Sequence, residues 1–221
     1  MKNPILITIV LGIIGSTLVI LSWPTNSTKP LPKASLPDQK KSVTRQLHIT
    51  ILPFGDFPEQ KVSAVRSGIK ELYGDVKITV LASKKLPEQA YYPPRKRYRA
   101  EKLLDYLDTQ LTDKNGKILG LTTVDISTTK GKYPDWGIFG LGRMGGEACV
   151  VSTFRLKRKA SDKLLLERLT KVVNHELGHT LGLPHCPTKR CLMEDAKGTI
   201  KTVDNETGIF CNSCKMKLKK K

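Results

Sequence analysis

Short apolar runs typical of strands alternate along this chain with segments in which apolar residues recur every three or four positions. The strand-like runs are residues 47–52, 76–81, 118–126 and 148–156, and the helix-like segments are residues 59–73, 97–111 and 161–181. This alternation predicts an α/β or mixed α+β domain. The glycine-rich stretch 137–146 is too irregular to predict a strand, and Ser161 is a candidate N-cap for the last helix.

A long apolar segment precedes this domain. Residues 5–23 carry no charge and are about as long as a helix that crosses a bilayer. No small-x-small cleavage site follows, so we expect residues 1–23 to be an uncleaved single-span membrane anchor, with a signal segment cleaved on export as the alternative. The proline- and lysine-rich residues 24–45 predict an extended linker. The charges around the span do not determine on which side of the membrane the domain lies.

The net charge of +18 on 221 residues suggests a polyanionic partner, but its distribution argues against one. Residues 1–45 carry +5, residues 46–214 carry +8, and the lysine-rich tail, residues 215–221, carries +5. More than half of the excess therefore lies outside the predicted domain. Since only 6% of residues are aromatic, stacking platforms are scarce, and we expect no specific nucleic acid partner. We interpret the charge run Arg95–Arg99 as the solvated start of a helix.

Three of the four histidines fall within eleven residues, at His175, His179 and His185. On a helix, His175 and His179 project from one face, as two ligands of one metal ion must. Gly182 lets the chain leave the helix sharply, which would bring His185 back as a third ligand. Three imidazoles leave a tetrahedral zinc ion with its fourth position open, as in catalytic sites. Glu176 is placed to reach a metal-bound water without being a ligand.

The cysteines form a second metal-binding pattern. Cys186 and Cys191 make one close pair and Cys211 and Cys214 another, and four thiolates in two such pairs fit a closed, structural zinc site. Two disulfides are the alternative, which gains weight if the domain is exported. Adjacent side chains of an extended segment point to opposite sides, so a zinc ion bound by Cys186 would hold the neighbouring His185 in position.

Together these residues resemble the full motif of the archaemetzincins, zinc peptidases of the metzincin clan. The resemblance rests on His175-Glu176-x-x-His179-x-x-Gly182-x-x-His185-Cys186, followed by Cys191-x-Met193 and by Cys211-x-x-Cys214. It extends upstream through Ala90–Arg95 and through Gly145–Leu156, so it covers about residues 46–214, the expected catalytic domain.

The resemblance implies a metzincin-like fold, with a mixed sheet and an active-site helix, and two zinc ions. The three histidines would bind the catalytic ion and the four cysteines the structural one. Glu176 would be the general base, and Met193 the Met-turn residue beneath the metal. We therefore expect a zinc metallopeptidase in which a zinc-activated water attacks the peptide bond, with no organic cofactor.

A zinc-stabilised, non-catalytic binding module at a membrane surface is the alternative function. The expected partners are a peptide or protein substrate and, through the N-terminal segment, a membrane, and we expect a monomer. The moderately basic domain favours acidic peptides. The sequence leaves endopeptidase and aminopeptidase action equally open, because it does not order the walls of the substrate subsites.

Overall fold

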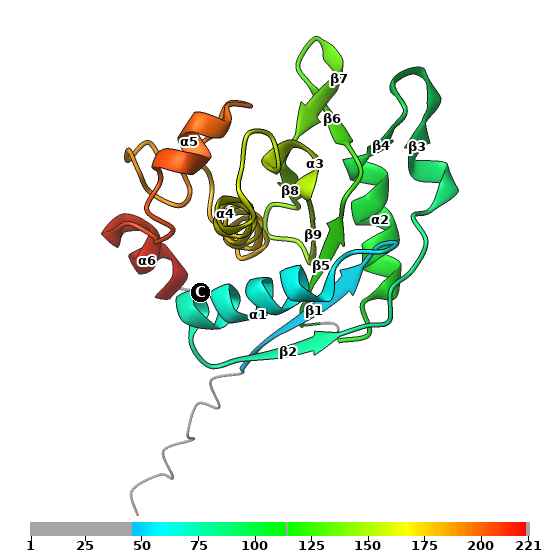
Figure 1. The fold of residues 1–221 in the computed structure, drawn as a ribbon. Coiled ribbons are helices and arrows are strands. Elements are labelled where there is room, and N and C mark those ends of the chain that lie inside the picture. Colours follow the sequence, from blue (N-terminus) through cyan, green and yellow to red (C-terminus); the bar gives the residue numbers. More distant parts are fainter. Residues whose placement is uncertain (1–45, 114, 220–221) are drawn as a thin grey trace, which may run out of the picture. The chain divides into compact units, whose positions relative to one another are not determined.

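A mixed five-stranded sheet forms the centre of the fold in the computed structural model, which describes residues 46–113 and 115–219 (Figure 1). Its strands lie in the order β2 (Val76–Val80), β1 (Leu47–Pro53), β5 (Lys117–Thr122), β9 (Ala148–Ser152) and β8 (Gly140–Gly142). The first four strands are parallel, and β8 pairs antiparallel with β9 at the edge of the sheet. The expected mixed sheet is thus confirmed.

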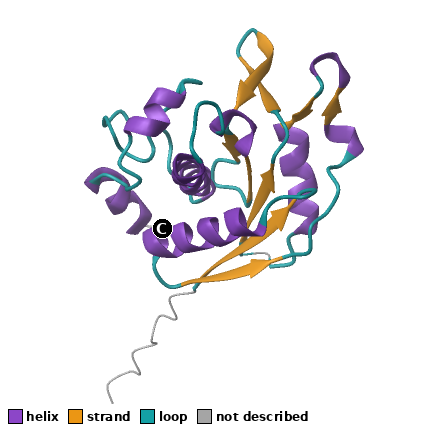
Figure 2. Ribbon diagram, in the orientation of Figure 1, coloured by secondary structure: helices purple, strands orange, loops and turns teal. Residues whose placement is uncertain are grey.

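Alternating side chains along the strands bury both faces of this sheet. Ile49 and Ile51 of β1 point to the face on which α1 (Glu59–Tyr73) and α4 (Asp162–Thr180) pack. Leu52 points to the other face, on which α2 (Ala100–Gln110) packs. Figure 2 shows α1 and α4 on one side of the sheet and α2 on the other. The sheet is therefore the middle layer of the domain.

A second, smaller sheet differs from the sequence prediction. In the described residues it has the order β3 (Tyr91–Tyr92), β4 (Arg97–Arg99), β6 (Ile126–Lys130) and β7 (Tyr133–Ile138). The expectation of no strand within residues 137–146 is wrong, because β7 ends and β8 lies within them. Neither strand has an alternating apolar pattern in its own sequence, and both are held by pairing, β7 with β6 and β8 with β9.

Two predicted strands end earlier than expected. The run 118–126 divides at Thr122, and Ile126 begins β6 in the smaller sheet. The run 148–156 ends at Ser152, whose hydroxyl accepts a hydrogen bond from the Phe154 N–H and so caps α3 (Thr153–Leu156). In both runs apolar residues continue past a turn, so periodicity alone did not locate the break.

The predicted helices are confirmed with small changes at their ends. Ser161 caps α4, since its hydroxyl accepts a 3.3 Å hydrogen bond from the Leu164 N–H. Helix α2 begins at Ala100 because residues 97–99 pair in β4. Four short elements complete the described chain: η1 (Glu88–Ala90), η2 (Pro93–Arg95), α5 (Ile200–Asn205) and α6 (Asn212–Lys219). Helix α6 continues past residue 214 into the lysine-rich tail, where Leu218 is partly buried.

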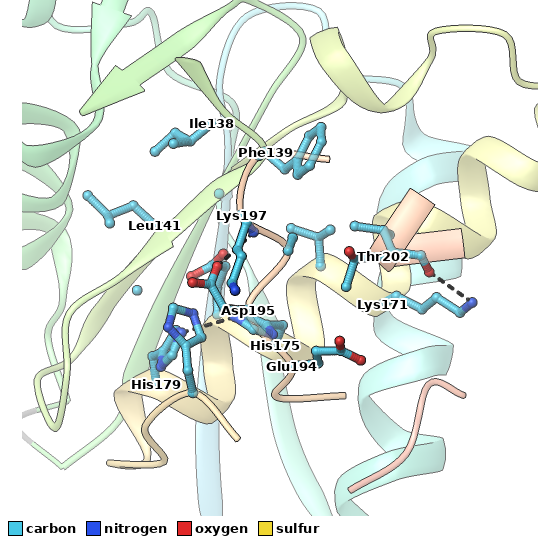
Figure 3. A pocket seen from close by; sticks show the side chains of 18 of the residues that line it. Ile138, Phe139, Leu141, Lys171, His175, His179, Glu194, Asp195, Lys197 and Thr202 are labelled. Carbon is cyan, nitrogen blue, oxygen red and sulfur yellow. Dashed lines mark hydrogen bonds between the residues drawn. The ribbon is translucent and has the colours of Figure 1, made fainter. Parts of the chain in front are cut away.

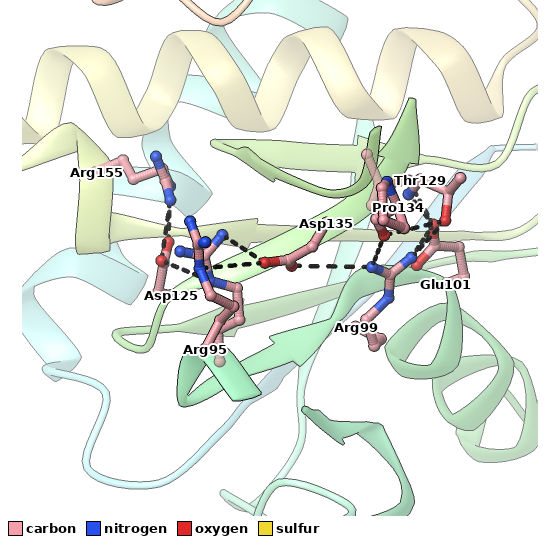
Figure 4. Close-up of polar contacts among 10 residues, drawn as sticks. Arg95, Arg99, Glu101, Asp125, Thr129, Pro134, Asp135 and Arg155 are labelled. Carbon is pink, nitrogen blue, oxygen red and sulfur yellow. Dashed lines mark hydrogen bonds and ion pairs between the residues drawn. The ribbon is translucent and has the colours of Figure 1, made fainter. Parts of the chain in front are cut away.

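The arginines of the charge run Arg95–Arg99 belong to a polar network, part of which Figure 4 shows. The interpretation as a solvated helix start is therefore wrong for Arg97 and Arg99, which lie on β4. The Arg97 side chain is 10% exposed and lies 3.2 Å from Asp125 and 3.4 Å from Asp135. Arg155 donates two hydrogen bonds to Asp125, at 2.7 and 3.0 Å. Because Asp125 precedes β6 and Asp135 lies on β7, this network fixes the β6–β7 hairpin to the rest of the domain.

The predicted anchor and linker, residues 1–45, lie outside the described residues. Within residues 46–113 and 115–219, no helix is both long enough and apolar enough to span a membrane. The N-terminal anchor therefore stays a prediction of the sequence.

Candidate metal centre

Helix α4 and the turn after it position the three predicted histidine ligands. His175 and His179 lie one turn apart on α4. Gly182 follows the helix at φ +78°, a conformation that favours glycine, and the Leu183 N–H donates a 2.9 Å hydrogen bond to the carbonyl of Gly178. The chain thereby reverses, and ligand atoms of the three histidines lie within 4.8 Å of one another. The structure brings the predicted set together.

Two of these histidines are oriented by backbone carbonyls. Nδ1 of His175 lies 2.7 Å from the Leu192 oxygen, and Nδ1 of His179 lies 2.8 Å from the Leu183 oxygen. Since a carbonyl only accepts, each Nδ1 carries the proton and each Nε2 presents a lone pair. The two Nε2 atoms lie 3.0 Å apart, so two lone pairs face each other. A shared cation relieves this repulsion, and the residues therefore fit a zinc ion.

Burial keeps these imidazoles neutral. It lowers the pKa of His175 to about 3, with the neighbouring His179 adding to the effect. Burial also lowers the pKa of His179. Neutral imidazole is the form that binds a metal ion. His185 is exposed, so the group of histidines opens to solvent on that side.

Glu176 is buried against the edge strand β8. Burial raises the pKa of its carboxyl group to about 8, although a hydrogen bond with the Gly142 backbone acts in the opposite direction. A Cβ on Gly140 would lie 2.7 Å from Cγ of Glu176, and one on Gly142 would lie 2.4 Å from the Glu176 carbonyl oxygen. Glycine at both positions lets β8 pass this close to α4. The glycines that made β8 unrecognisable as a strand from the sequence are thus required for its packing against α4.

A cavity of about 340 Å³ opens beside the three histidines (Figure 3). Strand β8 and the β6–β7 hairpin line one side with Ile138 and Leu141, and residues between 194 and 206 line the other. Six charged residues in this lining were not predicted from the sequence: Lys130, Lys171, Glu194, Asp195, Lys197 and Glu206. Of these, Lys171 carries a sequence signal, because it lies four residues before His175 on the same face of α4.

The four predicted cysteine ligands form a second cluster. Their sulfur atoms lie within 4.8 Å of one another, and all four are free thiols. The Sγ atoms of Cys186 and Cys211 are 3.7 Å apart, and those of Cys191 and Cys214 are 3.8 Å apart. A tetrahedral zinc ion with Zn–S bonds of about 2.3 Å separates its sulfur ligands by about 3.8 Å. This arrangement fits a closed zinc site and favours it over the two disulfides.

Met193, the expected Met-turn residue, is fully buried beneath α4. A Cβ on Gly178 would lie 2.6 Å from Sδ of Met193, so the thioether packs directly against the helix between His175 and His179. The residue before it, Leu192, supplies the carbonyl that orients His175. The segment that contains Met193 therefore packs beneath the candidate metal centre and supports it.

Comparison with known proteins finds relatives along most of the chain. Residues 43–220 match the sequence model of Peptidase family M54. The chain is 31% identical over 176 residues to an archaemetzincin of Haloarcula marismortui, covering 76% of this chain and 97% of that protein. Crystal structures of archaemetzincins from Methanopyrus kandleri and Archaeoglobus fulgidus give TM-scores of 0.69 and 0.66, at 33% and 27% identity. These matches cover 79% and 77% of this chain and 94% and 99% of those chains.

Proposed function

Since this chain belongs to peptidase family M54 and is a zinc metallopeptidase, we propose that its three clustered histidines hold the catalytic zinc and that Glu176 is the general base. The observation that carries this proposal is the pair of Nε2 atoms, 3.0 Å apart, on His175 and His179. Both offer a lone pair to a cation, and His185 completes a set of three nitrogen ligands. Three protein ligands are typical of a catalytic zinc site.

The proposed reaction is the hydrolysis of a peptide bond. When bound, zinc lowers the pKa of a coordinated water to about 7 and polarises a carbonyl oxygen. A cation bound beside Glu176 would favour its ionised form despite burial. That carboxylate would accept a proton from the attacking water and later deliver it to the leaving amine nitrogen. Because Glu176 follows His175 directly, it reaches the reacting atoms without occupying a ligand position. The Gly142 backbone holds its carboxylate by a hydrogen bond.

We also propose that the substrate backbone pairs with the free edge of β8. Within the described residues, β8 pairs with β9 alone, and its Gly140 and Leu141 line the cavity. An edge strand offers unpaired N–H and C=O groups to an extended peptide. A peptide held there would lie next to Glu176, because Gly140 and Gly142 pack against that residue.

A second zinc ion, held by the four cysteines, belongs to the same proposal. Its support is the separation of their sulfur atoms, 3.7 and 3.8 Å for the two closest pairs. Four thiolates fill all the positions of a tetrahedral ion, so this zinc would have a structural role.

The substitution Glu176→Ala tests the mechanism in the zinc-loaded protein. We expect it to keep its zinc and to lose peptide hydrolysis by about a hundredfold or more, the usual contribution of a general base. Glu71→Ala on the exposed side of α1 is the matched control and should keep both properties. Full turnover by Glu176→Ala would exclude the proposed mechanism. Absence of hydrolysis by the wild-type protein would favour the non-catalytic binding module.

We further propose that residues 1–23 anchor the enzyme to a membrane and that residues 24–45 link the anchor to the domain. The support is the uncharged apolar run at residues 5–23. Alkaline extraction of membranes from expressing cells should leave the full chain in the pellet, with an intact N-terminus by sequencing. A protein released into the supernatant, with an N-terminus beyond residue 23, would favour a cleaved signal.

A further inference from the structure

The cavity continues past the three histidines by about one turn of α4. Lys171, His175 and His179 are spaced four residues apart and all line it, so they lie along one face of the helix. One helical turn is about 5.4 Å. In Figure 3, Lys171 and Thr202 lie on the far side of His175 from His179. We call this region the side pocket; its lining residues are Lys171, Val172, Thr202, Val203 and Glu206.

The side pocket combines apolar walls with a buried carboxylate. Val172 and Val203 are each 5% exposed, and Glu206 is 8% exposed. The Glu206 carboxylate accepts a hydrogen bond from the Gly208 N–H, at 3.0 Å to Oε2. No ion pair in the part of the chain that the structure describes includes Glu206. Its carboxylate therefore retains capacity to accept further hydrogen bonds.

Lys171 attracts Glu206 but does not form an ion pair with it. The Lys171 ammonium lies 2.9 Å from the Glu167 carboxylate and donates a 3.2 Å hydrogen bond to the carbonyl of Val203. Two of its three donors are thus directed elsewhere. Because Glu167 balances the charge of Lys171, the Lys171 ammonium does not neutralise the ionised form of Glu206.

The other cations of the cavity leave this charge in place. Lys130 and Lys197 interact with Asp195, which in turn interacts with His185 among the metal ligands. Burial raises the pKa of Glu206 to about 7, so its ionised form lacks the stabilisation that water would give it. A cation that enters the side pocket would supply that stabilisation.

We propose that Glu206 is a specificity-determining residue that binds the lysine or arginine side chain of a substrate residue adjacent to the scissile bond. This inference rests on the proposed function of the metal centre. The apolar stem of such a side chain would lie between Val172 and Val203, and its cationic end would reach the carboxylate. Glutamate and aspartate side chains would be repelled at the same place.

This preference differs from the one that the whole-domain charge suggests. The moderately basic domain favours acidic peptides as a long-range effect, which salt screens. The side pocket contacts one side chain in a buried setting, where screening is weak. One substrate can satisfy both preferences if it has a basic residue in the side pocket and acidic residues farther along the peptide.

Cleavage and binding of matched peptides test the inference with the full-length, zinc-loaded protein. The peptides differ only in having lysine, glutamine or glutamate at each of the two positions that flank the scissile bond. At one of these positions we expect kcat/KM for lysine to exceed that for glutamine by about tenfold or more, as for a hydrogen bond between charged groups. Binding of the same peptides to the Glu176→Ala protein, measured by fluorescence anisotropy, should show the same order.

Glu206→Gln should reduce the ratio of kcat/KM for the lysine peptide to kcat/KM for the glutamine peptide to about twofold or less. Glu206→Lys should reverse the preference toward glutamate, and the shorter Glu206→Asp should keep its direction. Glu71→Gln removes the same charge from the surface of α1 and should change nothing. Thermal unfolding checks that each variant folds.

An unchanged lysine preference in Glu206→Gln would overturn the inference, as would a wild-type preference for glutamate at both positions. The binding assay separates this outcome from a failure of the proposed function. If the wild-type protein binds lysine peptides through Glu206 but hydrolyses none, the mechanism fails while the specificity inference stands.

Discussion

The backbone N–H of Cys186 donates a 2.7 Å hydrogen bond to the carbonyl oxygen of Met193. Cys186 belongs to the cysteine cluster and directly follows His185, whereas Met193 packs beneath α4 beside the histidines. The two candidate metal sites are therefore connected through the backbone between residues 185 and 193. A change in one site should affect the other.

Cys191→Ser is expected to disturb both sites. It removes one sulfur of the cysteine cluster, and the loss of support around His185 should weaken zinc binding at the histidines by about tenfold to a hundredfold. Zinc content by mass spectrometry and competition with a chelator would measure this. Cys149→Ser is the control, because Cys149 is buried in the core and outside the cluster. Unchanged zinc affinity and activity in Cys191→Ser would show that the two sites are independent.

Gly178→Ala should destabilise the protein even though alanine favours a helix. The new Cβ would lie 2.6 Å from Sδ of Met193, and such overpacking typically costs about 1–3 kcal/mol, against about 1 kcal/mol gained in helix propensity. In a Met193→Ala background the same substitution should be less harmful, because the clashing thioether is gone. Chemical denaturation of the four proteins measures the coupling, and additive effects would contradict the assigned contact.

Asp125→Asn should lower the free energy of unfolding by about 3 kcal/mol, because it leaves Arg97 and Arg155 without the full charge of their shared carboxylate. The matched control is Asp105→Asn, whose 2.8 Å ion pair with Arg143 lies at the surface. Exposed pairs contribute about 0–1 kcal/mol, so the control should be close to neutral. Equal effects of the two substitutions on denaturant midpoints would refute a special role for the network.

The pH dependence of stability should contain a contribution from Glu206. Burial raises the pKa of Glu206 in the folded state to about 7, above its pKa in the unfolded chain. At a pH between these two pKa values, the folded protein therefore binds more protons than the unfolded chain. Its contribution to stability is therefore full at low pH and is lost as the pH rises toward 7. Relative to Glu206→Gln, wild-type stability should fall with pH by at most about 1.4 kcal/mol per unit.

Lys171, Glu167 and Glu194 also act on Glu206, and these three groups are the same in both proteins. Comparing urea unfolding of the wild-type protein and Glu206→Gln from pH 5 to pH 8 therefore isolates the titration of Glu206. A stability difference that does not vary with pH would contradict the raised pKa.

The candidate metal ligands were predictable because their spacing follows local geometry. His175 and His179 are one helical turn apart, and Gly182 reverses the chain within a few residues. These relations depend on backbone geometry over a few residues, so the spacing of the residues in the sequence is enough to predict them. The main strands and helices were predictable for the same reason, since a buried face repeats with the period of its element.

Other parts of the site follow from contacts between distant segments. Gly140 packs against Glu176, which is 36 positions later in the chain, and nothing near Gly140 in sequence announces a strand. The acidic partners of Arg97 are Asp125 and Asp135, which lie in a later part of the chain. The charge run around Arg97 therefore looked solvated when only its neighbours in sequence were considered. Glu206 reaches the cavity because α5 packs beside α4.

The sequence by itself determined which residues can bind zinc, because ligand chemistry and short spacing are properties of the chain. Only the tertiary structure decided what surrounds the candidate metal centre: the edge strand beside Glu176, the carboxylate in the side pocket and the hydrogen bond from Cys186 to Met193. The physical reason is that contacts of polar residues and glycines between distant segments leave no repeating pattern in the sequence. They are specified when the apolar faces of the sheet and helices come together.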